Sequence, residues 1–218
     1  MKEVLLQILP DMKLWKLHAA KEYVVFVLLL LSGAAIFYIW VARLKRARTP
    51  AGARKRIVRA VKKASKQNCR FFVPACPSLV DDSIWVALEH DILLLQIFPK
   101  GFRIYCSERN ERWELFDNSS KESVPNPLPS LEKITAQLQQ HFQNAGITTM
   151  QFHAFVVCGD NYAEPEFHLD AKTAEHAFST RTLATWIKKR KSGPLSEKAI
   201  TTIEEALKGW ATPMKGVY

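Results

Sequence analysis

The chain has 218 residues, with 31 Lys and Arg against 21 Asp and Glu, which gives a formal net charge of +10. This length is enough for one compact domain with a substantial core in addition to a tether. The four cysteines are not closely spaced in pairs, which excludes the usual zinc-binding patterns. So basic a composition is typical of proteins that bind nucleic acid or an anionic membrane, and the positions of the charges distinguish these classes.

Residues 23–42 are twenty consecutive positions without a charged side chain. A helix of this length covers the roughly 30 Å of hydrocarbon in a bilayer, so we predict a membrane span after a short tail over 1–22. A cleaved signal peptide and a buried soluble helix are the alternatives. The apolar core is long and begins late for a signal peptide.

The two flanks of the predicted span differ in charge. Residues 43–70 hold twelve Lys and Arg and no acid, whereas the four Lys before the span are offset by three acids. Positive charges next to a span tend to stay on the cytoplasmic side. We therefore expect a single-pass protein of the cell membrane, in bacteria the inner membrane, with its N-terminus outside and its C-terminal domain in the cytoplasm. In that compartment the cysteines are expected to stay reduced.

The same count changes the meaning of the net charge. Residues 71–218 contain fifteen basic and eighteen acidic side chains, so the bulk of the predicted domain is slightly acidic. The positive charge belongs to the tether, and a nucleic-acid-binding surface across the whole domain is not supported.

A basic linker is predicted over 43–53, because Thr49–Gly52 has a linker-like composition, and an amphipathic helix over 54–66. Ile57, Val61 and Ala64 fall on one face of this helix, which can dock on a core. Its basic side chains are candidates for contact with anionic lipid or with the phosphates of nucleic acid, and the nearby span favours lipid. These candidates are Arg54, Lys55, Arg56, Arg59, Lys62, Lys63 and Lys66.

Apolar runs predict five strands in the first half of the domain. They cover residues 69–73, 83–88, 92–98, 101–106 and 112–116. The second and third strands are expected to form a hairpin, and the fourth is expected to pair with the fifth. The third strand is apolar on both faces, which is typical of a central strand.

Helical periodicity begins at Leu131, with Ser130 as a possible N-cap and Gly146 as the stop signal. The apolar run over 152–158 is then predicted to be a buried parallel strand that the chain enters from this helix.

Two further helices are predicted around 182–191 and 197–207, the second capped by Ser196, and a tail over 209–218. Antiparallel strands followed by a crossover helix, a parallel strand and more helices predict an α/β domain with a mixed sheet and flanking helices over 54–208.

This order of elements resembles the nuclease-related domain (NERD) family over roughly residues 52–208. The points of resemblance are Asp82, the end of the central strand at Leu95–Phe98, Gly101, Trp113, Asn126–Leu128, the Val156-Val157 strand and the closing segment 195–207. The resemblance implies a restriction-endonuclease-like fold and metal-dependent cleavage of phosphodiesters. In that chemistry, carboxylates from two strands hold Mg²⁺ or Mn²⁺, which polarises the phosphate and activates water, while a lysine stabilises the charge.

The chain departs from the family at the positions that would carry this chemistry. Where the family's central strand has a Glu, one intervening residue and a Lys, this chain has Gln96 and Phe98. Asp82 is retained as a possible first metal ligand, Gln96 offers a neutral carbonyl, and Lys100 lies two residues beyond Phe98. Phe98 offers neither a charge nor a proton. The helix over 54–66 also lacks the glutamate that family members often carry near its start.

We therefore expect a membrane-anchored, degenerate nuclease-like domain that is a non-catalytic binding or assembly module without a cofactor. Its partner would be anionic lipid, DNA or RNA, or another membrane protein. The alternative is a membrane-tethered nuclease that uses Asp82, Gln96 and Lys100 with Mg²⁺ or Mn²⁺.

Two smaller patterns complete the sequence. Glu164, Glu166, His168 and Asp170 alternate and could hold a cation on an extended segment, but the surrounding polar residues and Pro165 favour a solvated loop. Cys106 and Cys158 lie in predicted strands and are expected to be small buried hydrophobic residues.

Overall fold

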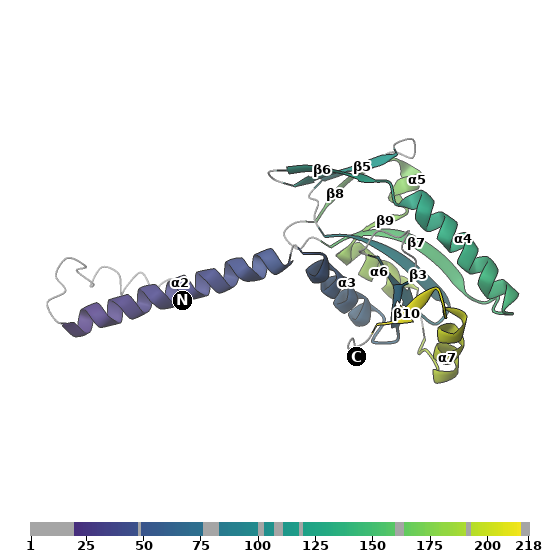
Figure 1. The fold of residues 1–218 in the computed structure, drawn as a ribbon, viewed down its shortest axis with the longest axis horizontal. Coiled ribbons are helices and arrows are strands. Elements are labelled where there is room, and N and C mark those ends of the chain that lie inside the picture. Colours follow the sequence, from purple (N-terminus) through teal and green to yellow (C-terminus); the bar gives the residue numbers. More distant parts are fainter. Residues whose placement is uncertain are drawn as a thin grey trace. The chain divides into compact units, whose positions relative to one another are not determined.

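The computed structural model describes residues 20–47, 49–75, 83–99, 103–106, 111–117, 120–159, 164–190 and 193–214. It divides into two compact units, Met1–Lys45 and Arg46–Tyr218. The second unit is a mixed α/β domain with two sheets (Figure 1). The predicted positions Asp82, Lys100 and Gly101 lie outside the described residues.

Helix α2 (Ala20–Ala47) contains the predicted span. Over Tyr23–Arg43 it is long and apolar enough to cross a membrane, and none of this stretch is buried within the protein. A signal sequence near an N-terminus meets the same criteria. The predicted helix is confirmed, and it continues for five residues beyond position 42 into the basic segment.

Helix α3 (Pro50–Ala64) begins four residues before the expected start at Arg54. Thr49 is its N-cap, because the Thr49 side chain accepts a hydrogen bond from Gly52 N at 3.1 Å, and Pro50 occupies the first turn. The linker expected over Thr49–Gly52 is therefore wrong. The expected C-terminal end is also wrong, since Lys66 lies beyond the helix with a positive φ of 53°.

The six-stranded sheet has the order β10-β1-β2-β3-β7-β9. Its strands are β10 (Ala211–Pro213), β1 (Arg70–Pro74), β2 (Ser83–Ala87), β3 (Asp91–Phe98), β7 (Gln151–Cys158) and β9 (Ala177–Ser179). The predicted β2–β3 hairpin is antiparallel and β7 is parallel to β3, which confirms both expectations. Every residue of β3 is buried, as expected of a central strand.

The crossover from β3 to β7 contains helix α4 (Leu128–Asn144). This helix begins earlier than expected and Ser130 is not its N-cap. Pro127 occupies that position, and Asn126 Oδ1 accepts a hydrogen bond from Leu128 N at 3.0 Å. The predicted stop is confirmed, because Gly146 follows the helix with a φ of +77°.

A four-stranded sheet has the order β6-β5-β4-β8. It contains β6 (Ser120–Pro125), β5 (Arg112–Asp117), β4 (Arg103–Cys106) and β8 (Glu166–Leu169). The predicted pairing of β4 with β5 is confirmed. The solvated loop expected around Glu166 is wrong, because β8 pairs in parallel with β4. Strand β6, which pairs with β5, was not predicted.

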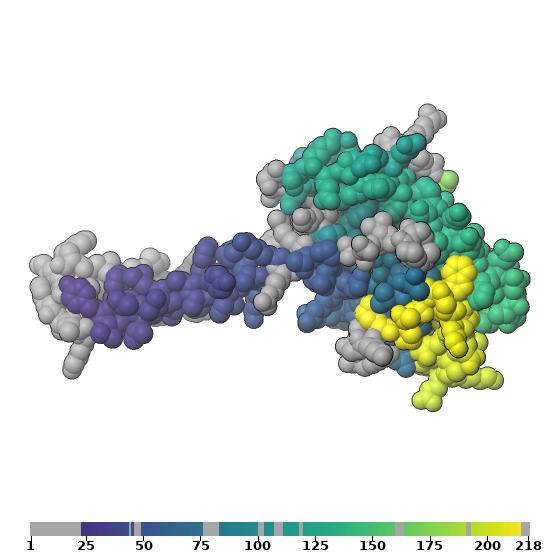
Figure 2. Space-filling model, in the orientation of Figure 1, coloured from purple at the N-terminus to yellow at the C-terminus, as the bar shows by residue number. Residues whose placement is uncertain are grey.

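The C-terminal part adds a short helix α5 (Ala171–Ala174) and helices α6 (Thr180–Lys189) and α7 (Glu197–Ala206). Ser196 caps α7 as predicted, since its Oγ accepts a hydrogen bond from Ala199 N at 3.1 Å. The tail expected over 209–218 instead contributes edge strand β10, which pairs with β1. The C-terminal segment therefore lies against the first part of the domain (Figure 2).

Two cores lie on opposite faces of the six-stranded sheet. One face packs against α3 and α6, which lie side by side (Figure 1). The other face packs against α4, α7 and the inner side of the four-stranded sheet. Strand β3 supplies Leu93, Leu95 and Ile97 to the first core and Ile92, Leu94 and Phe98 to the second. This alternation fixes the direction in which the remaining β3 side chains point.

Candidate functional site

Gln96 lies near the carboxyl end of β3, between its register partners Ser83 of β2 and Val156 of β7. Because side chains alternate along a strand, Gln96 points to the same side as Leu94 and Phe98. Both of these residues belong to the core under α4 and the four-stranded sheet. Gln96 is only 1% exposed, so the candidate metal ligand lies in the interior of the domain.

The Gln96 amide lacks a hydrogen-bond partner for both Oε1 and Nε2 in the part of the chain that the structure describes. Trp85 Nε1 and Trp113 Nε1 are buried in the same core and also lack a partner there. An unpaired buried polar group costs about 1–3 kcal/mol. The core beside Gln96 is therefore less completely hydrogen-bonded than its burial would require.

Phe98 stands where the family resemblance places a lysine. Its ring is buried, at 6% exposure, and packs edge-to-face on Trp113 of β5 with ring centroids 5.6 Å apart. Such aromatic pairs contribute about 0.5–1.5 kcal/mol beyond their buried area. Position 98 therefore carries an uncharged ring that packs the six-stranded sheet against the four-stranded sheet.

The described residues at this position do not by themselves make a site for Mg²⁺ or Mn²⁺. Gln96 offers one neutral oxygen and Phe98 offers none, whereas Mg²⁺ takes six oxygen ligands, usually with at least one carboxylate. The other two candidates, Asp82 and Lys100, lie outside the described residues.

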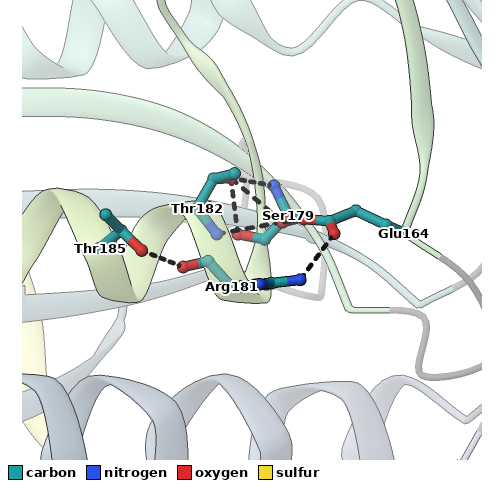
Figure 3. Close-up of polar contacts among 5 residues, drawn as sticks. All are labelled: Glu164, Ser179, Arg181, Thr182 and Thr185. Carbon is teal, nitrogen blue, oxygen red and sulfur yellow. Dashed lines mark hydrogen bonds and ion pairs between the residues drawn. The ribbon is translucent and has the colours of Figure 1, made fainter.

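The alternating residues from Glu164 to Asp170 each have a protein partner. Glu164 accepts a hydrogen bond from Ser179 Oγ at 3.1 Å and pairs with Arg181 at 3.4 Å (Figure 3). Glu166 pairs with Arg103 at 3.0 Å. Asp170 caps α5 by accepting a hydrogen bond from Thr173 N at 2.8 Å. No group of three His, Cys, Asp or Glu suited to a metal ion occurs among the described residues.

The basic candidates of the α3 region fall into two sets. Lys55, Arg59, Lys63 and Lys66 are exposed, whereas Arg54, Arg56 and Lys62 are half-buried. Arg56 is engaged inside the domain, where its Nε donates to the carbonyl oxygen of Gly159 at 2.8 Å. The exposed set is therefore the part of the predicted surface that can meet a partner.

A polar cluster that the sequence did not predict lies at the amino ends of β3 and β7. His153 Nε2 lies 2.8 Å from Asp91 Oδ1, and an Arg190 terminal nitrogen lies 3.5 Å from the same oxygen. Arg190 also donates to Gln151 Oε1 at 3.1 Å, and its guanidinium lies 4.5 Å from the centroid of the Trp186 ring. The cluster joins the two central strands to the C-terminal end of α6.

In the sequence these residues are dispersed, and His153 alone gives no signal of a partner. The parallel register places Asp91 opposite Gln151, which brings His153 to the carboxylate from two residues further along β7. Only that register could have revealed the cluster. The Asp91 side chain is 6% exposed, and its contacts with His153 and Arg190 link the strand ends to the C-terminal end of α6.

The thiols of Cys69 and Cys106 have raised pKa values. Burial raises the pKa of the Cys106 thiol to about 11, and Asp170 adds to the rise. Burial also raises the pKa of Cys69, although Ser65, Lys62 and Arg70 oppose it. Cys106 and Cys158 are buried in strands β4 and β7, as expected. Raised pKa values disfavour the thiolate that nucleophilic catalysis needs.

No protein-family profile, curated protein or solved structure matches the chain.

Proposed function

We propose that this protein is a single-pass membrane protein whose cytoplasmic domain is a non-catalytic binding or assembly module, a degenerate relative of the NERD family. The observation that carries the proposal is the Phe98–Trp113 pair. Where a nuclease of that family would hold a lysine beside the phosphate, this chain buries an aromatic ring that stabilises the contact between its sheets.

The order of elements supports a restriction-endonuclease-like arrangement. An antiparallel β2–β3 hairpin is followed by helix α4 and by β7, which is parallel to β3. The candidate position Gln96 lies on the central strand of this unit. This order of elements is what supports the proposed restriction-endonuclease-like fold.

Helix α2 supports the membrane anchor, because its large apolar side chains from Tyr23 to Trp40 are exposed, apart from the half-buried Phe26. Such a surface is stable in lipid and costly in water. The twelve basic residues over 43–70 support the proposed orientation, with the N-terminus outside and the domain in the cytoplasm, at the inner membrane if the protein is bacterial.

A tethered nuclease is the second candidate, and the unpartnered amide of Gln96 is the observation that favours it. A buried carbonyl without a donor is a group that a cation could satisfy. In this candidate Asp82 and Gln96 would hold Mg²⁺ or Mn²⁺, and Lys100 would supply the positive charge that Phe98 lacks.

The test uses the full chain in detergent or nanodiscs, incubated with DNA and RNA in the presence of Mg²⁺ or Mn²⁺. We expect no cleavage. Cleavage that disappears in Asp82→Ala would overturn the proposal in favour of the nuclease. The anchor has its own test: the chain should stay with membranes during alkaline carbonate extraction, and mass spectrometry should find residues 23–42 in the mature protein. Loss of these residues would identify a signal peptide instead.

A further inference from the structure

Helices α3 and α6 make one continuous layer on the six-stranded sheet. They contact each other, and their inner side chains share one core with strands β3 and β7. Ile57 and Val61 of α3 are buried in that core together with Leu183 and Ile187 of α6. The outer sides of the two helices therefore form one surface, which is called here the α3–α6 face.

The α3–α6 face is basic without acidic residues of its own. Neither helix contains an Asp or Glu. Its exposed basic side chains without an ion pair in the described structure are Lys55, Arg59, Lys63, Lys188 and Lys189. Arg181 at the start of α6 differs, since Glu164 approaches it from the segment before β8 (Figure 3).

The helices on the other side of the sheet have a different charge. Helix α4 carries one acid and one base, Glu132 and Lys133. Helix α7 carries three acids and one base, with Lys198 as the base. Of these four helices, only α3 and α6 carry more basic than acidic side chains that are charged at neutral pH, whereas α4 is balanced.

The covalent connection between the proposed span and α3 is short. Pro50 starts α3 three residues after α2 ends at Ala47. The backbone between the apolar stretch and Pro50 is at most roughly 20 Å long. A domain held this close meets the headgroups at a high effective concentration, whereas nucleic acid has to arrive from solution.

We propose that the α3–α6 face docks on the anionic phospholipid headgroups of the leaflet next to α2. This inference rests on the proposed membrane anchor and names the partner of the proposed binding module. Lys and Arg side chains near an anionic leaflet each add to the attraction, which salt screens within about a Debye length. The additional element is α6, which lies more than a hundred residues after α3 and supplies Lys188 and Lys189 to the same surface.

The test is covalent lysine footprinting of the full chain in nanodiscs, read by mass spectrometry. One set of discs contains phosphatidylcholine alone and the other contains phosphatidylcholine with phosphatidylglycerol. We expect the labelling rates of Lys55, Lys63, Lys188 and Lys189 to fall several-fold in the anionic discs and to recover at high salt. Lys133 and Lys198, exposed on α4 and α7, are internal controls whose rates should not change.

A pair of matched variants separates this face from charge in general. The double variant Lys188→Glu with Lys189→Glu should lower the ratio of docked to undocked domain at least roughly thirty-fold, and so restore labelling of Lys55 and Lys63. The matched double variant Lys133→Glu with Lys198→Glu makes the same change in net charge on the other side and should leave the footprint unchanged. Replacement by Gln in place of Glu gives a milder second pair if a reversed charge impairs folding.

Three results would overturn the proposal: equal labelling in neutral and anionic discs, protection of α3 without α6, or protection only after DNA or RNA is added. The last result would assign the face to nucleic acid. A failure of the anchor is distinguishable, because the chain would then not copurify with nanodiscs. Footprinting with neutral and anionic vesicles would still test the face in that case.

Discussion

The guanidinium of Arg56 donates two hydrogen bonds to the backbone carbonyl oxygen of Gly159, from Nε at 2.8 Å and from a terminal nitrogen. Gly159 directly follows β7, and its own N–H donates to Phe98 O at 2.8 Å. The contact therefore holds α3 against the carboxyl ends of the two central strands. One of the basic residues expected to bind an outside partner is engaged in this internal joint.

Replacing Gly159 with Ala is expected to destabilise the domain by about 1–3 kcal/mol. An added Cβ would lie 2.8 Å from Ala53 Cβ and 3.3 Å from Ala53 Cα, so α3 would have to shift. Urea denaturation measures the loss. The double variant Gly159→Ala with Ala53→Gly removes the clashing methyl group and should recover part of the stability. A Gly159→Ala domain as stable as the wild type would contradict this close approach.

Phe98→Lys is expected to cost about 3 kcal/mol or more, because it buries an ammonium group where the ring now packs on Trp113. Phe98→Leu keeps an apolar side chain there and should cost only about 1 kcal/mol. The two urea midpoints, compared at equal m values, check this difference. Equal stability of the two variants would show that position 98 opens to solvent and that the Phe98–Trp113 contact is not structural.

Gln96→Met is expected to be neutral or to stabilise the domain by up to about 2 kcal/mol, because it removes a buried amide without a hydrogen-bond partner and keeps a similar volume. Gln96→Glu should destabilise the domain, increasingly so above the pKa of the new carboxyl group, since the charge would be buried. Thermal unfolding at about pH 5 and about pH 8, both above the ordinary pKa of a glutamate, measures both effects. A large loss for Gln96→Met would mean that the amide holds a bound group.

Stability should fall at alkaline pH because of Cys106. Burial raises the pKa of its thiol from 9.0 to about 11. The unfolded thiol loses its proton first, so the stabilising contribution is fully present below pH 9 and is lost as the pH rises towards 11. The stability of Cys106→Ala should decline less steeply than that of the wild type over this range. Urea unfolding at each pH measures this difference. An equal fall in the free energy of unfolding for the two proteins would contradict the assignment.

The cluster around Asp91 should show unequal couplings. His153 approaches the carboxylate to 2.8 Å, whereas Arg190 is 3.5 Å away and more exposed. Double-mutant cycles with Asp91→Asn should therefore give a larger coupling energy with His153→Gln, about 1–3 kcal/mol, than with Arg190→Gln. Chemical denaturation of the six proteins in the two cycles measures both. A larger coupling to Arg190 would reverse this ranking.

The central elements could be predicted because their residues are unambiguous. The apolar runs that become β3 and β7 are too hydrophobic for an exposed position. Gly146 marks the end of α4, and Ser196 marks the start of α7. Strand β6 was missed because it is largely exposed and shows no apolar alternation. Strand β10 was missed because three residues are too few to show a pattern, and its pairing partner β1 lies far away in the sequence.

The candidate site was less accessible to sequence than the fold. The sequence shows Gln96 and Phe98 where the resemblance would lead us to expect Glu and Lys, but the Trp113 ring beside Phe98 comes from another sheet. Likewise, Thr49 and Pro50 look like a linker until the hydrogen bond to Gly52 N shows that they start α3. Contacts between residues far apart in sequence decide which of two plausible meanings such residues have.

Strand β3 receives its two neighbours at very different times during synthesis. Strand β2 ends four residues before β3 begins, whereas β7 ends at Cys158, sixty residues after Phe98. A ribosome adding about 5–20 residues per second needs roughly 3–12 s to cover that distance. For those seconds one edge of the most apolar strand in the domain has no partner, and such edges pair with other chains. The nascent protein is therefore most open to aggregation, and most in need of a chaperone, between the emergence of residues 98 and 158.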